Sequence, residues 1–153
     1  MTTDSVALPR DRDEAISALF VTHHARLVGL ARLLVDDLPT AEDVVQDAFT
    51  ALYRRWPWLR DHGAALGYLQ ASVANGARSS LRRRRTVREI VLDRPPDAPS
   101  AETSAVASDD QRRMVAALAE LPARQRQVLV LRYYLDQSEA EIATTLSISR
   151  GSV

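Results

Sequence analysis

The side chains most able to bind a charged or polar partner lie on one predicted helix, residues 66–88. One face of this helix carries the polar or charged residues Asn75, Arg78 and Arg82, and the arginine run Arg82 to Arg85 follows directly. Arginine binds phosphate oxygens in bidentate pairs, so this face predicts binding of a polyanion. The helix dipole also favours arginine at a helix C-terminus, and that structural explanation stays open. The apolar stripe that would hold the helix to a core recurs at three- and four-residue steps: Leu66, Leu69, Val73, Ala77 and Leu81.

Acidic and basic residues are segregated along the chain, although the formal net charge is zero. Residues 36–53 contain five acids and no base, whereas residues 54–94 contain ten arginines and three acids. Such segregation predicts two partners of opposite charge, one basic and one a polyanion. Neutralisation of one block by the other within the chain is the alternative.

The composition argues against an enzyme. The chain has no cysteine and no glycine-rich phosphate loop, and its acids and histidines lack the spacing of a metal site. His23 and His24 are adjacent and therefore point in different directions on a helix. We expect no catalytic residue, no metal and no cofactor. Because no apolar run reaches the length of a membrane span and no signal peptide is evident, we expect a cytoplasmic protein without membrane insertion.

The first part of the chain predicts a three-helix bundle. Residues 1–12 lack periodicity and predict a flexible tail, and residues 13–92 predict a helical domain. Thr40 with Asp43 approximates a capping box that would start the second helix. Pro57 would end that helix, because proline disfavours helix in the residue before it.

The second part predicts another small helical domain, so the fold class is all-α, with two domains. Residues 93–108 are rich in Pro, Ser, Ala and acids and predict a flexible linker. Within residues 109–153, Ser138 and Glu141 form a capping box before a short helix, and Ser149 is the expected N-cap of the next. Two short helices with so brief a turn are typical of a helix-turn-helix, whose second helix enters the major groove of DNA.

Three ordered blocks resemble the extracytoplasmic-function (group IV) sigma factors of bacterial RNA polymerase, and the type is actinobacterial-like. They are AEDVVQDAF at residues 41–49, a YLxxxVANxARxxLRRRR helix at 68–85, and LPxRQRxVLxLRYY from residue 121 into the helix-turn-helix. The resemblance implies a promoter-melting, core-binding domain followed by a region-four domain. It implies that the protein binds RNA polymerase core and directs transcription initiation at the minus-ten and minus-thirty-five elements.

The resemblance also implies roles for particular residues. Asp43, Gln46 and Asp47 match the docking surface for the β′ clamp helices, and the β flap and promoter DNA are further implied partners. Asn75 matches an asparagine that holds a flipped base, and an amide side chain supplies both donor and acceptor for that purpose. The implied DNA-binding residues are Arg60, Tyr68, Asn75, Arg78, Arg82, Arg83, Arg84, Arg85, Ser149, Arg150 and Ser152.

The sequence also departs from the family pattern. Leu59 stands where other members carry an aromatic residue, and Tyr68 where many have tryptophan. Family members continue past the position of Val153, so the helix-turn-helix is expected to be truncated and to recognise the upstream promoter element weakly or not at all.

Two other functions remain open. A dimeric helix-turn-helix regulator of duplex DNA would explain the last helices but not the acidic block or the Asn75 helix. A helical adaptor would explain the bundles but not the helix-turn-helix pattern. Sigma factors of this type are commonly held by an anti-sigma factor, which the resemblance implies as a further partner.

Overall fold

The computed structural model describes residues 11–90 and 108–153, with residues 84–90 described by their backbone alone. This part of the chain is helical and contains no strand, which confirms the predicted all-α class. The predicted tail and linker fall largely on residues 1–10 and 91–107, outside the described residues. The elements are α1 Arg12–Leu34, α2 Leu38–Arg55, η1 Trp56–Trp58, η2 His62–Ala64, α3 Ala65–Ile90, α5 Asp109–Ala119, α6 Ala123–Tyr133, α7 Glu139–Leu146 and η3 Arg150–Ser152.

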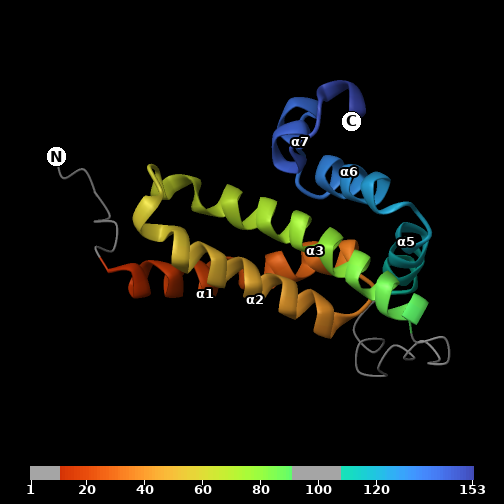
Figure 1. Ribbon diagram of the computed structural model, residues 1–153, viewed down its shortest axis with the longest axis horizontal. Helices are drawn as coiled ribbons and strands as arrows, with labels where there is room; N and C mark the ends of the chain where they lie inside the picture. Colours follow the sequence, from red (N-terminus) through yellow and green to blue (C-terminus); the bar gives the residue numbers. More distant parts are fainter. Residues whose placement is uncertain (1–10, 91–107) are drawn as a thin grey trace.

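Helices α1, α2 and α3 lie side by side as a bundle (Figure 1). Each helix turns its apolar stripe inward, as the spacing predicts, and the largest fully buried side chains include Leu30 of α1, Leu52 of α2 and Leu69 of α3. The polar faces of the same helices are thereby left at the surface. None of the described helices is both long and apolar enough to cross a membrane.

The start of α2 differs from the predicted capping box. The N-cap is Asp37, whose Oδ1 accepts a hydrogen bond of 2.8 Å from the backbone N–H of Thr40. Pro39 lies in the first turn, and Thr40 is 8% exposed inside the helix. Proline is tolerated there because first-turn N–H groups have no partner within the helix. The prediction of Thr40 as N-cap was therefore wrong by one turn.

We expect Asp37→Ala to lower the free energy of unfolding by about 1 kcal/mol, because it removes the acceptor for an otherwise unpaired helix N–H. Asp37→Asn keeps an acceptor oxygen at this position and should retain most of the stability. Urea unfolding followed by circular dichroism measures both variants. An equal loss in Asp37→Asn and Asp37→Ala would assign the effect to charge instead of capping.

Capping boxes also start two of the C-terminal helices. Ser108 and Gln111 cap α5, and Ser138 and Glu141 cap α7, the latter as predicted. Helix α7 ends at Ser147, whose φ of 55° places it in the left-handed region and turns the chain toward η3. These features make the short helix and tight turn that a helix-turn-helix requires.

The C-terminal helices pack against one side of the bundle (Figure 1). Helices α5 and α6 contact α1, and α6 and α7 contact α3. Val130, Leu131 and Ile142 join the same continuous apolar core as the bundle residues. We refer to the contact of α6 and α7 with α1 and α3 as the seam.

Candidate polymerase and nucleic-acid surfaces

An acidic face on α2 is formed by Asp43, Gln46 and Asp47, all three of which are exposed. They are neighbours because residues three and four apart lie on the same side of a helix. The intervening residues Val44 and Val45 are buried and hold this side of α2 outward. The predicted core-binding residues therefore form one continuous surface.

Arg83 of α3 lies beside the acidic face. With Ser80 it lines a groove between α2 and α3 whose other wall includes Asp43, Gln46 and Asp47. One predicted DNA-binding residue is thus brought next to the predicted core-binding residues. The acidic face of α2 and the basic end of α3 therefore meet along this groove.

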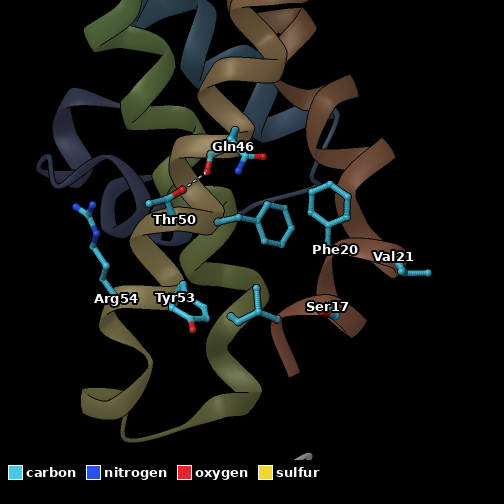
Figure 2. A pocket seen from close by; sticks show the side chains of 9 residues that line it. Ser17, Phe20, Val21, Gln46, Thr50, Tyr53 and Arg54 are labelled. Atoms are coloured by element: carbon cyan, nitrogen blue, oxygen red, sulfur yellow. Dashed lines mark hydrogen bonds between the residues drawn. The ribbon is translucent and has the colours of Figure 1, made fainter. Parts of the chain in front are cut away.

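A second groove, largely apolar, lies between α1 and α2 and shares Gln46 with the acidic face. Phe20 points from α1 toward α2, where Thr50 and Gln46 lie one turn apart (Figure 2). The Phe20 ring lies 5.1 Å from that of Phe49, yet Phe20 is 38% exposed and the adjacent Val21 is 85% exposed. Phe20 therefore lies at the edge of the bundle and not within its core. The groove itself could not be inferred from spacing, because its two walls come from different helices.

The loop before α3 is held by aromatic stacking and a turn. Trp56 is 8% exposed, and its ring centroid lies 4.1 Å from that of His62. The Asp61 carboxylate accepts a 2.8 Å hydrogen bond from the N–H of Gly63 and caps η2. This scaffold leaves Arg60 exposed and Trp58 77% exposed.

The polar face of α3 presents Asn75 at the surface. Its Nδ2 donates to the Ala71 carbonyl at 2.9 Å and to the Thr145 carbonyl of α7 at 3.2 Å. Arg78 is half-buried, and Arg82 is exposed one turn further on. The face is therefore polar at Asn75 and positive beyond it.

The other predicted DNA-binding residues fall into three groups. Tyr68 is half-buried and packs against the core at the start of α3. Ser149, Arg150 and Ser152 are exposed in the turn formed by η3, and Ser149 Oγ lies 2.8 Å from Ser152 Oγ. The side chains of Arg84 and Arg85 lie outside the described residues.

Two arginines of α6 occupy the seam, and sequence reasoning assigned neither a role. Arg126 is 2% exposed and reaches the end of α1. Arg124 has a buried Nη1 without a hydrogen-bond partner among the described residues. Burial lowers the pKa of the Arg124 guanidinium, and the charges of Arg78 and Arg82 lower this pKa further. Both arginines belong to the LPxRQRxVL block that carries the family resemblance, but nothing in the local pattern RQRQV predicts that Arg126 is buried and Arg124 half-buried.

Among the side chains that the structure describes, those of residues 11–83 and 108–153, no group of three or more His, Cys, Asp or Glu could hold a metal ion. The surfaces described above offer a partner charged side chains, amide hydrogen-bonding groups and apolar contacts.

Comparison with known proteins agrees with this organisation. Residues 19–87 match the family model described as sigma-70 region 2, and residues 111–153 match that of sigma-70, region 4. The RNA polymerase sigma-E factor of Streptomyces avermitilis is 33% identical over 132 residues, which cover 86% of this chain and 73% of that relative. The ECF RNA polymerase sigma factor SigM of Mycobacterium tuberculosis is 30% identical over 144 residues, which cover 91% of this chain and 69% of that relative.

The two family matches occur in the order predicted from the acidic, basic and helix-turn-helix blocks. The first contains the acidic face and the Asn75 helix, and the second contains α6, α7 and η3. The chain therefore belongs to the extracytoplasmic-function group of the sigma-70 family, the sigma factors that direct promoter recognition by RNA polymerase.

Proposed function

We propose that the acidic face of α2 docks on the β′ clamp helices of RNA polymerase core. The observation that carries this proposal is the exposure of Asp43, Gln46 and Asp47 as one surface of the three-helix bundle. Carboxylates steer a basic partner and set its orientation, whereas apolar contacts supply much of the affinity. The apolar groove beside Gln46 offers such contacts in Phe20 and Val21.

The polar face of α3 is the surface we propose for the opened promoter. Asn75 would hydrogen-bond an unstacked base of the minus-ten element, because its amide carries both donors and an acceptor. Arg78, Arg82 and Arg83 would neutralise phosphates of the same strand. Tyr68 lies in the first turn of the same helix, and Arg60 lies in the loop between η1 and η2 that precedes it. Arg84 and Arg85 extend the basic run in the sequence.

Catalysis and promoter recognition are divided between polymerase and this chain. Polymerase performs the catalysis, and this chain supplies promoter choice as a non-catalytic factor in the cytoplasm. Ser149, Arg150 and Ser152 would face the minus-thirty-five element, while the C-terminal helices would meet the β flap. An anti-sigma factor would compete with core for these surfaces.

We expect Asn75→Ala to lower promoter-dependent transcription about 10- to 100-fold, as removal of a specific base contact costs about 1–3 kcal/mol. Run-off transcription with purified core and a promoter selected by this chain measures the change. Ser79→Ala is the matched control, because Ser79 is exposed one turn further along α3. Binding to core should be unchanged in both variants. Equal transcription by Asn75→Ala and Ser79→Ala would refute the role of Asn75.

A further inference from the structure

Arg126 joins the C-terminal helices to the end of α1. Its Nε donates to the Leu33 carbonyl at 2.7 Å, and its Nη2 donates to the Val35 carbonyl at 3.0 Å. Its Nη1 lies 3.2 Å from Asp36 Oδ1 in an ion pair. The last carbonyls of a helix lack partners within it, and a buried cation there is favoured by the helix dipole. The guanidinium thus binds a site that α1 offers only at its C-terminus.

Two further hydrogen bonds cross the seam to neighbouring residues of α3. Gln127 is 2% exposed, and its Nε2 donates to the Ala74 carbonyl at 2.7 Å. Asn75 Nδ2 donates to the Thr145 carbonyl at 3.2 Å, while its bond to Ala71 uses the other amide hydrogen. Both amide donors of Asn75 are therefore engaged, and the backbone of α7 lies against the residue proposed to hold a promoter base.

We propose that the C-terminal helices are an intramolecular cover on α3, with Arg126 as the latch. The cover engages the amide nitrogen of Asn75 through the Thr145 carbonyl and leaves the rest of that side chain exposed. In the closed chain described here, α7 competes with promoter DNA for Asn75. Opening of the seam is then required before the chain binds the opened strand. This inference rests on the proposed function, because it assigns Asn75 to DNA.

The seam also contains features that favour opening. Arg124 lies one turn before Gln127 on α6, close enough to Arg78 and Arg82 of α3 for their charges to lower the pKa of its guanidinium. The three positive charges of Arg124, Arg78 and Arg82 repel one another across the seam. Gln127 Oε1 is buried without a partner among the described residues, which costs stability.

Helix α5 adds little to the closed state, since it has no buried residue. The C-terminal helices are thus held mainly through α6 and α7. Segments with few buried contacts open more readily than the core of a domain. The balance between the Arg126 latch and the arginine repulsion sets how often the cover opens.

The test exploits the absence of cysteine from the chain. Ala25→Cys on α1 and Ala140→Cys on α7 are exposed positions for spin labels, and pulsed electron paramagnetic resonance measures the distance between them. We expect one narrow distance in the otherwise unchanged protein and added longer distances with Arg126→Met. Arg124→Met, the same substitution two residues away on the same helix, should keep the single narrow distance, because it removes repulsion across the seam.

An unchanged distance distribution in folded Arg126→Met would overturn the latch. If circular dichroism shows that Arg126→Met does not fold, Gln127→Ala is measured in its place. We again expect added longer distances, and an unchanged distance distribution would again overturn the latch. Both outcomes concern conformation alone and do not depend on the proposed function.

Binding of a fluorescein-labelled single-stranded DNA of mixed sequence, without polymerase, supplies the functional readout. If the closed form is about nine-tenths populated, Arg126→Met should tighten binding about tenfold, because apparent affinity scales with the competent fraction. Adding Asn75→Ala should cancel much of that gain. If Arg126→Met adds longer distances but does not bind the single-stranded DNA more tightly, the proposal that the C-terminal helices are a cover would be overturned. Tighter binding that Asn75→Ala leaves unchanged would overturn the role of Asn75 and leave the latch standing.

Discussion

We expect the Asp43→Arg, Asp47→Arg double variant to lose stable binding to RNA polymerase core, with affinity falling about 100-fold or more. Breaking close charge pairs in a binding interface costs about 2–5 kcal/mol, and reversing the sign adds repulsion. Both carboxylates are exposed on α2, and neither side chain belongs to the core of the bundle. The fold should therefore be retained while the docking surface is lost.

Equilibrium binding of fluorescently labelled protein to purified core measures this effect. The matched control is Asp109→Arg, Asp110→Arg, which makes the same change in net charge on exposed residues of α5. Loss of binding in the first variant alone supports docking through the acidic face. Equal losses in both variants would assign the effect to net charge, and full binding by the α2 variant would exclude this face as the docking surface.

We expect Leu69→Ala to lower the free energy of unfolding by about 2–5 kcal/mol. Leu69 is fully buried in α3 among the side chains of the three-helix bundle, so its truncation removes apolar contacts and leaves a cavity. A domain of this size is stable by only about 5–15 kcal/mol, so the loss is a large fraction of the total. Core binding and DNA binding should weaken together, because α3 carries one surface and packs against the helix that carries the other.

Urea titration of the two-tryptophan chain, followed by fluorescence and circular dichroism, measures this loss. Val21→Ala is the surface control, since Val21 is 85% exposed on α1 of the same bundle. Its effect should stay within about 0.5 kcal/mol. Similar losses in the two variants would contradict the assignment of Leu69 to the core.

Local sequence patterns were sufficient to predict the helices and which of their faces is buried. The spacing of Leu69, Val73 and Ala77 predicted which side of α3 is buried, and the exposed side carries Asn75 as expected. The capping box at Ser138 was also predicted correctly. Each of these features depends on residues within a few positions of one another, so the sequence alone determines them.

Competition between neighbouring residues decided the start of α2. Thr40 and Asp37 are both able to cap a helix, and the tertiary structure uses Asp37. Pro39 is compatible with the first turn, so the helix begins before Thr40, which is then buried. Sequence preference alone did not rank the two caps.

The family and its two polar surfaces could be predicted because the acidic block, the Asn75 helix and the helix-turn-helix occur in a recognisable order. Only the tertiary structure decided which residues of separate helices contact one another. It placed Phe20 at the edge of a groove and Arg126 against carbonyls more than ninety residues away in the chain. A buried arginine is stable only where unpaired acceptors and a carboxylate converge, and that convergence depends on how separate helices pack. The sequence by itself therefore determined the helices and their chemical faces, while packing at the seam decided that Asn75 Nδ2 donates to the Thr145 carbonyl of α7.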